Sequence, residues 1–290
     1  MIVPFSPGGP SDVVARLLAQ KLSEQLGLQF YVENVSGAGG NVGAGRAAKA
    51  PADGYTMLIV SPGYVINPTL YGKVPYDPNT SFDPVTLVAT STVVLAVNPS
   101  VSAKTVNDLV ALIKASPRKY SYASPGIGTP GHLVGEQFRH SLDLDIVNVP
   151  FKGAGEAVGS TVAGHTPITF AAPAPIVPHL NEGTLRALAV TNKTSSQTLR
   201  GVPTMAEAGY PDIEFDNWTG VVVPAGTPKE IIAFLNREIG KVIALSEMRE
   251  RFIALGFDPV GSSPEDFDRR CKVDFDKWRK LIQAFNIKPE

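Results

Sequence analysis

The sequence predicts an α/β protein of two lobes that face each other across a ligand-binding cleft. Strand-like and helical segments alternate along the chain, which favours parallel sheets covered by helices over an all-α or all-β fold. The 290 residues, of which 43% are hydrophobic, are enough for two cores of ordinary size. A strand, a Pro-Phe pair, a glycine turn and a helix start occur twice, at residues 3–9 and 149–155. Two such units far apart in the sequence predict the two lobes.

The first of these units spans residues 2–16. A short apolar strand leads into a turn rich in proline, glycine and serine, and apolar residues recur at helical spacing from Val13 on. Ser11 or Asp12 can cap this helix, and the two glycines of the turn allow a close approach of the backbone to a ligand. A helix N-terminus presents unpaired N–H groups and the positive end of the helix dipole. We therefore expect this turn to hold one carboxylate of a small ligand.

The next segment, residues 36–45, is the densest glycine cluster of the chain. It is either a loop that leads into a small-residue helix at 42–49, packed close to a sheet, or a second backbone cradle for ligand. Strands are expected at 28–35 and 55–60. The second strand ends at Ser61, and open α/β sheets bind ligands at the carboxyl ends of their strands. Ser61 is therefore a candidate ligand contact.

The remaining elements follow the same alternation of strands and helices. Strands are expected at residues 93–97, 120–124, 145–149, 168–172, 185–191 and 221–223, and helices at 133–139, 231–245, 247–255 and from 267 to 281 after a cap at 263–266. Thr105 followed by Asp108 predicts a helix N-terminus. Thr227, Pro228 and Glu230 predict a capping box at the start of another helix.

The lobe boundary is expected near Asn98, where a proline-rich loop gives way to a fresh series of strands and helices. The first lobe then comprises residues 1–98 and 217–290, and the second comprises 99–216. The chain would cross between them near Asn98 and again near Asn217. Such crossings can absorb the backbone rotation of a hinge.

Composition excludes several classes of partner and site. The net charge is −1, from 26 basic and 27 acidic residues without long runs of one sign, so we expect neither nucleic acid nor an anionic membrane surface as partner. Cys271 is the single cysteine, which leaves no internal disulfide, and we expect it to be structural. No apolar run reaches the roughly 18 residues of a membrane span. Strand-like residues follow Met1 at once, so we expect no signal peptide within this sequence.

One weak motif in the sequence indicates an enzyme. Residues 126–131 satisfy G-x-G-x-x-G, and Asp145 follows at a distance near that of a dinucleotide fingerprint, so a nicotinamide-dependent oxidoreductase is the alternative function. Pro130 removes one N–H from that turn, and the preceding strand is short and polar. The four histidines show no metal-ligand spacing, and no nucleophile motif is present. We expect no catalytic residue, no metal and no cofactor.

What remains is binding chemistry without reactive groups. Several strand ends carry glycine, serine, threonine and helix N-termini, which suits a carboxylate held by neutral dipoles. His132, directly after a glycine turn, could help to hold a carboxylate or could simply begin the helix. Phe5 and Phe151 flank the two repeated turns and could form the wall of the cavity or pack in the core.

Six blocks of sequence carry a family resemblance. These blocks are residues 2–16, 33–43, 52–56, 150–153, 202–211 and 224–228. In order and spacing they resemble the Bug family, the substrate-binding proteins of tripartite tricarboxylate transporters. The resemblance implies a two-lobed fold of the periplasmic-binding-protein type and a monomeric periplasmic receptor. It also implies that the lobes close over a small mono- or dicarboxylate, aliphatic or aromatic, which is delivered to the membrane components of the transporter.

The resemblance also implies which loops contact the ligand. They are the loop after the first strand and a glycine-threonine loop of the second lobe that ends in a histidine, with contributions from the loop at Ser61 and from residues 152–154. The candidate ligand-binding residues are Phe5, Gly9, Pro10, Ser11, Asp12, Ser61, Ser124, Gly126, Gly128, Thr129, His132, Lys152, Gly153, Ala154 and Asp216. Gly155 and Glu156 depart from the proline-alanine pair that is common in the family.

Overall fold

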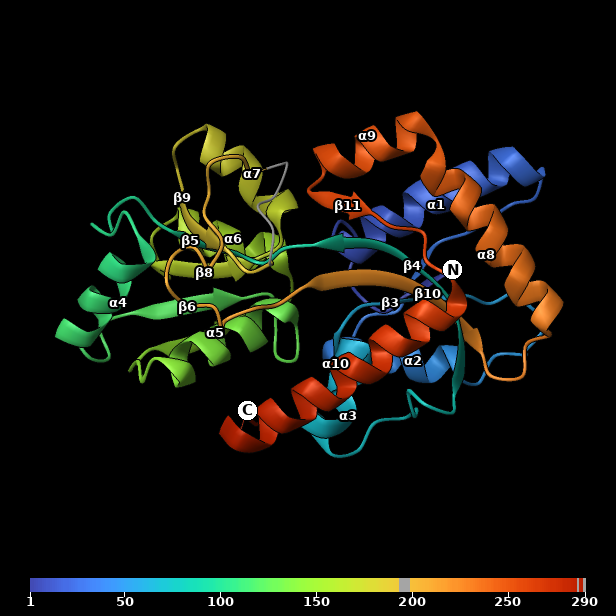
Figure 1. Cartoon of the computed structure of the whole chain (residues 1–290), viewed down its shortest axis with the longest axis horizontal. Coiled ribbons are helices and arrows are strands. Elements are labelled where there is room, and N and C mark those ends of the chain that lie inside the picture. The colour runs from blue at the N-terminus through green and yellow to red at the C-terminus, as the bar shows by residue number, and fades with distance from the viewer. Residues whose placement is uncertain (193–198, 286, 289–290) are drawn as a thin grey trace. The chain divides into compact units, whose positions relative to one another are not determined.

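A computed structural model describes residues 1–192, 199–285 and 287–288, and it divides the chain into two compact units. Of the described residues, unit 1 contains Met1–Thr90, Trp218–Ile253 and those from Phe257 to Lys288, and unit 2 contains those from Ser91 to Asn217 with Ala254–Gly256. Each unit has its own sheet and its own covering helices (Figure 1). The chain therefore passes from unit 1 to unit 2 after Thr90 and returns after Asn217.

Unit 1 is built on a six-stranded sheet of order β11-β4-β10-β3-β1-β2. The strands are β1 (Ile2–Val3), β2 (Glu33–Asn34), β3 (Leu58–Val60), β4 (Phe82–Ser91), β10 (Asn217–Pro224) and β11 (Phe257–Pro259). Strand β1 is parallel to β2 and β3, whereas β10 is antiparallel to β3. The α/β class is confirmed, but the sheet is mixed, because β10 joins the predicted parallel strands in the antiparallel sense. The loops after β1 and β3 leave the same edge of the sheet because these two strands are parallel neighbours.

The helices of unit 1 bury one apolar face each, as their spacing predicts. They are α1 (Pro10–Leu26), α2 (Asn41–Ala47), α3 (Gly63–Tyr71), α8 (Lys229–Ala244), α9 (Ser246–Ala254) and α10 (Pro264–Phe285), with a short 3-10 turn η1 (Ala38–Gly40). In α1 the side chains of Val14, Leu18 and Leu22 are fully buried, which confirms the predicted periodicity. The indole of Trp218 in β10 is fixed by α10, where Asp274 accepts its N–H at 2.6 Å.

Two predicted helix caps are wrong. Helix α1 begins at Pro10 with Gly9 as its N-cap, and no side chain of the described chain caps it, so neither Ser11 nor Asp12 does so. Helix α8 begins at Lys229, and the hydroxyl of Thr227 donates instead to the carbonyl oxygen of Pro224 at 2.7 Å. In both places a proline at the helix start removes an N–H that would otherwise need a cap. The cap at Thr105 is confirmed.

Unit 2 is built on a five-stranded sheet of order β7-β6-β8-β5-β9. The strands are β5 (Val94–Val97), β6 (Ser121–Ser124), β7 (Val147–Pro150), β8 (Ile168–Ala171) and β9 (Arg186–Val190), and the helices are α4 (Val106–Ala115), α5 (Pro130–Ser141), α6 (Ala154–Val162) and α7 (Pro173–Asn181). Strand β6 is parallel to both β7 and β8. Strand β5, expected before the lobe boundary, pairs antiparallel with β8 and β9. The change of unit therefore falls before β5, at Thr90 and Ser91.

The parallel arrangement of β6, β7 and β8 positions the helices that follow them. Each of these strands runs into a helix, α5, α6 and α7 respectively, so three helix N-termini start at the same edge of the sheet. Helix α5 lies so close to β8 that a Cβ on Gly131 would be 2.1 Å from the carbonyl oxygen of Phe170. Among the described residues, every helix is too short or too polar to cross a membrane.

Candidate functional site

The turn after β1 is closed by its own first helical turn. Gly8 adopts a positive φ of 81°, a conformation that glycine takes without strain. The N–H of Gly8 donates to Oδ2 of Asp12 at 2.9 Å. Pro10 occupies the first helical position, and the N–H of Val13 is the one that bonds back to Gly9, at 3.0 Å. The turn is thus held in shape before any ligand is bound, which favours binding because less order has to be imposed.

Both carboxylate oxygens of Asp12 accept hydrogen bonds that hold this turn. Besides Gly8, it accepts hydrogen bonds from Nε of Arg16 at 2.9 Å and from Nδ2 of Asn34 at 2.8 Å, and the same Asn34 amide donates to the carbonyl of Phe5 at 3.0 Å. Burial by itself would raise the pKa of Asp12, but the hydrogen bonds from Arg16, Gly8 and Asn34 lower it below its ordinary value. The structure therefore supports a positioning role for Asp12, and its contact with ligand stays a prediction.

The loops after β1 and β3 meet in unit 1. Phe5 and Ser61 line the same small cavity of about 10 Å³, close to the space that one water molecule needs. Gly40 also lines it, and a Cβ there would be 3.2 Å from the ring of Phe5. A Cβ on Gly43 would be 2.8 Å from Cα of Pro4, so the small-residue helix α2 packs directly on the turn. This confirms the packed-helix interpretation of the glycine cluster.

The second glycine turn joins β6 to α5 in unit 2. Gly126 and Gly128 have φ values of 130° and 79°, and a Cβ on Gly126 would be 3.1 Å from the carbonyl oxygen of Phe151. The hydroxyl of Thr129 donates to the carbonyl of Gly126 at 2.6 Å, and the N–H of Thr129 reaches the same oxygen at 3.2 Å. These contacts hold the turn tightly against the neighbouring strand, with α5 starting immediately after it.

Ser124 is the last residue of β6, and within the described residues its hydroxyl group is free to bond a ligand or a water molecule. The residue is fully buried, and its Oγ has no hydrogen-bond partner in the described part of the chain. A buried hydroxyl without a partner costs about 1–3 kcal/mol relative to one that is satisfied. Ser124 ends the strand that leads through residues 125–129 into α5, a helix whose N-terminus favours an anion. The orphan hydroxyl is therefore a strong candidate for a ligand or water contact.

His132 presents a neutral ring to this turn. The residue is 4% exposed, and its Nδ1 lies 3.3 Å from the N–H of Gly128, which makes Nδ1 the acceptor. Burial lowers the pKa of His132 to about 4, Glu136 acts in the opposite direction, and Arg139 lowers the pKa further. At neutral pH the ring therefore carries one proton, and Nε2 holds it because Nδ1 accepts. His132 is thus a neutral hydrogen-bond donor.

The turn after β7 lies beside the turn after β6. Ser124 is paired in register with Pro150, and the N–H of Phe151 donates to the carbonyl of Ser124 at 2.9 Å. Gly153 is the N-cap residue of α6, and no side chain in the described residues caps that helix. Lys152 is exposed, and its N–H lies 3.4 Å from a carboxylate oxygen of Glu156. Unit 2 therefore gathers the predicted residues of both turns at one edge of its sheet.

Asp216 lies at the end of unit 2, one residue before Asn217. The N–H of Phe215, the preceding residue, donates to the carbonyl of Thr191 at 3.0 Å, and the side chain of Asn217, the following residue, donates to Oγ of Ser91 at 2.9 Å. Asp216 is therefore placed where the chain leaves unit 2. Its role as a ligand contact stays a prediction.

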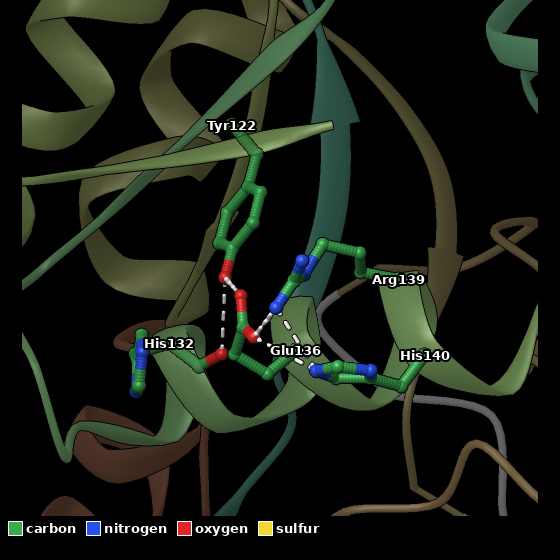
Figure 2. A network of polar contacts seen from close by, with 5 residues as sticks. All are labelled: Tyr122, His132, Glu136, Arg139 and His140. Carbon is green, nitrogen blue, oxygen red and sulfur yellow. Dashed lines mark hydrogen bonds and ion pairs between the residues drawn. The ribbon is translucent and has the colours of Figure 1, made fainter. Parts of the chain in front are cut away.

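The sequence did not predict a polar network that connects β6 to α5. Figure 2 shows the hydroxyl of Tyr122 in β6 directed at the carboxylate of Glu136 in α5, a hydrogen bond of 2.7 Å. Arg139 and His140 contact the other oxygen of that carboxylate. Tyrosine in a small, polar strand and a glutamate on a helix are unremarkable in sequence, so the only available signal was the i, i+3 spacing of Glu136 and Arg139. Asn34 was missed for the same reason.

The dinucleotide alternative lacks its acidic residue. Because β6 and β7 are parallel and paired from Ser121 with Val147 to Ser124 with Pro150, Asp145 precedes β7 at the edge opposite the glycine turn. A fingerprint acid must stand at the same edge as the glycines to reach the ribose. Asp145 instead pairs with Arg118 at 3.3 Å. Within the described residues, no group of three or more histidine, cysteine, aspartate or glutamate side chains could hold a metal ion.

Comparisons with known proteins agree on one family. Residues 14–287 match the family described as tripartite tricarboxylate transporter family receptor. The solved structure of the R. palustris protein Rpa4515 with adipate is 35% identical, with a TM-score of 0.94 over 100% of this chain and 97% of that one. The periplasmic binding protein BugD is 30% identical, with a TM-score of 0.93 over 100% and 98% of the chains. MatC from Rhodopseudomonas palustris with bound malate is 29% identical, with a TM-score of 0.90 over 97% of each.

Proposed function

The chain belongs to the tripartite tricarboxylate transporter receptor family, and on that premise we propose that it captures a small organic carboxylate for delivery to a membrane transporter. The resemblance to the Bug proteins is thereby confirmed. The observation that carries the proposal is the fully buried Ser124, whose hydroxyl lacks a partner in the described chain and which ends the strand that leads into α5. A carboxylate is an acceptor that this hydroxyl and the helix N-terminus can both satisfy.

The donors of unit 2 are neutral, which suits a carboxylate of low charge. The hydroxyl of Ser124, the Nε2–H of His132 and the backbone N–H groups that begin α5 and α6 bring dipoles without a buried cation. Such dipoles stabilise one negative charge and need no counter-ion to be desolvated with it. Lys152, at the turn after β7, is exposed and can add attraction for an anion without a desolvated charge. The buried donors themselves are neutral and suit a carboxylate.

We assign the second contact to the turn of unit 1, residues 7–12. Its first helical turn offers N–H groups to an acceptor, and the hydrogen bonds of Asp12 hold the turn ready. Each turn by itself can hold one carboxylate group. Relatives with bound adipate and malate are consistent with a dicarboxylate, a mono- or dicarboxylate being the class proposed here. The chain undergoes no reaction with this ligand in the proposed role.

The proposed setting follows from the family. A receptor of this family serves a transporter, so we place the protein in the periplasm, with the membrane components of a tripartite transporter as its partners. We propose that it acts as a monomer. Gel filtration coupled to light scattering would give a mass near 30.8 kDa for this chain.

The test is a binding screen by thermal unfolding followed by calorimetry. The panel contains adipate, malate, succinate, benzoate, inorganic phosphate, NAD and ATP. A ligand that binds only the folded state at a hundred times its Kd stabilises it by about 2.7 kcal/mol. We expect stabilisation by at least one carboxylate and none by phosphate or the nucleotides. Stabilisation by NAD together with no response to any acid would contradict the proposal.

A pair of variants links the response to the site. Ser124→Ala removes the orphan hydroxyl, and Ser121→Ala is the matched control at the other end of β6. The carboxylate that stabilises the unaltered protein should stabilise the control equally and the Ser124 variant less. Equal stabilisation of all three proteins would place the ligand elsewhere.

A further inference from the structure

Helix α5 packs directly on the ring of Tyr122. It is fully buried in the middle of β6, and the ring of Phe170 in β8 meets it edge-on at 5.5 Å and 89°. A Cβ on Gly135 would be 2.2 Å from Cε2 of Tyr122, so the helix passes over the ring at a distance that only glycine permits. The ring of Tyr122 is therefore one of the contacts that fix the position of α5 across the sheet, together with the close approach of Gly131 to Phe170.

The hydroxyl of Tyr122 sets the position of α5 along the strand. It donates to Oε1 of Glu136 at 2.7 Å and lies 3.4 Å from the carbonyl oxygen of His132 (Figure 2). Burial by itself would raise the pKa of Glu136, but hydrogen bonds from Arg139 and Tyr122 lower it, so the carboxylate is ionised at neutral pH. A hydrogen bond to an ionised group in a buried site is among the stronger ones.

We propose that Tyr122 is a positioning residue for ligand binding, and the proposal rests on the proposed function. Tyr122 itself is buried and does not touch ligand. It holds the first two turns of α5, which carry the His132 ring, and that ring in turn binds the N–H of Gly128 at 3.3 Å. Without the hydroxyl, α5 can shift along β6, and the long His132–Gly128 contact breaks first. The Nε2–H donor and the glycine turn then lose their fixed geometry, and a weaker complex follows.

The competing explanation is that Tyr122 only fills the core. Tyr122→Phe separates the two accounts, because it keeps the ring and its contacts with Gly135 and Phe170 and removes the hydroxyl alone. Tyr210→Phe is the matched control in unit 2. The Tyr210 hydroxyl also donates to a side chain, at 2.6 Å, but its acceptor is Oδ1 of Asn107 in α4.

The first readout needs no ligand. Nitrogen NMR of the histidine rings reports which ring nitrogen carries the proton. In the unaltered protein His132 should show a protonated Nε2 and an accepting Nδ1. We expect Tyr122→Phe to shift the His132 signals toward a mixture of the two tautomers and Tyr210→Phe to leave them unchanged. Unchanged His132 signals in the Tyr122 variant would overturn the proposal whether or not a ligand is known.

The second readout is the Kd for adipate and malate by calorimetry. For whichever acid the unaltered protein binds, Tyr122→Phe should weaken binding about tenfold and Tyr210→Phe should not change it. Glu136→Gln keeps an acceptor for the Tyr122 hydroxyl, so its Kd should lie closer to that of the unaltered protein than to that of Tyr122→Phe. An equal Kd for Tyr122→Phe and the unaltered protein would overturn the proposal. If the unaltered protein binds no acid at all, the proposed function fails, and the NMR readout still decides the role of Tyr122.

Discussion

The side-chain amide of Asn217 donates a 2.9 Å hydrogen bond to the hydroxyl of Ser91, and both residues are buried. Ser91 is the first residue of unit 2 and Asn217 is the last residue before the chain returns to unit 1. This hydrogen bond therefore joins, within unit 2, the residue at which the chain enters the unit to the residue at which it leaves. Two residues further along, the backbone N–H of Val93 donates to the hydroxyl of Thr191 at 3.1 Å. This second hydrogen bond connects the start of unit 2 to the residue that follows β9.

Removing the hydrogen bond between Asn217 and Ser91 should destabilise the fold. Asn217→Ala leaves the buried hydroxyl of Ser91 without the amide, and we expect a loss of about 1–3 kcal/mol in the free energy of unfolding. Urea unfolding monitored by tryptophan fluorescence and circular dichroism measures it. The control is Asn79→Ala on an exposed loop, which should change the free energy by about 0.5 kcal/mol or less. Equal effects of the two variants would show that the bond to Ser91 contributes little.

Ser124 should be dispensable for folding and important for binding. Ser124→Ala removes a fully buried hydroxyl that has no partner among the described residues, so we expect unchanged or slightly higher stability. The affinity for the bound carboxylate should fall about tenfold, because a hydrogen bond to a charged acceptor is lost. Thermal unfolding and calorimetry on the same preparation give the two numbers. A less stable protein with unchanged affinity would contradict the assignment.

The protonation of His132 should appear in the pH dependence of stability. Its pKa is about 4 in the folded protein against an ordinary value of 6.5, so the unfolded chain takes up the proton first as the pH falls. The contribution of the neutral ring is complete above about pH 6.5 and is lost as the pH falls to about 4, up to roughly 3 kcal/mol.

The measurement compares His132→Gln with the unaltered protein. Unfolding free energies at pH 7.5 and pH 4.5 are determined for both, so that the carboxylates, which titrate in both proteins, cancel in the difference. The unaltered protein should lose more stability between the two pH values than the variant does. Parallel losses would mean that His132 is not buried as a neutral ring.

Asp12 should matter for the stability of unit 1. Asp12→Asn keeps the shape but cannot accept on both oxygens from Gly8, Arg16 and Asn34, and we expect a loss of about 1–3 kcal/mol. Asp53→Asn is the control, because the Asp53 carboxylate only accepts from the N–H of Tyr55, at 3.0 Å on the surface. Guanidinium unfolding at pH 7 measures both. If Asp12 acted only on ligand, its variant would unfold like the control.

Local pattern was enough to predict the unit that is repeated in each half of the chain. The apolar spacing in α1 and the glycines before α1 and α6 specified strand, turn and helix, because these depend on neighbours within a few residues. Helix starts were less predictable where proline competes with a capping side chain, as at Pro10 and Pro228. Strand β5 was assigned to the wrong side of the boundary region because its partner residues in β8 and β9 lie 71 to 96 residues further along the chain.

The sequence by itself determined the alternation of strands and helices, the two glycine turns and the family of this protein, since all three are written in short-range spacing and composition. Only the tertiary structure decided what the side chains at those turns do. It showed that Asp12 accepts hydrogen bonds from Gly8 and Asn34, that Ser124 is buried without a partner in the described chain, and that His132 is a buried neutral ring in the first turn of α5. Burial and long-range hydrogen bonds set these states, and both arise only when distant segments pack together.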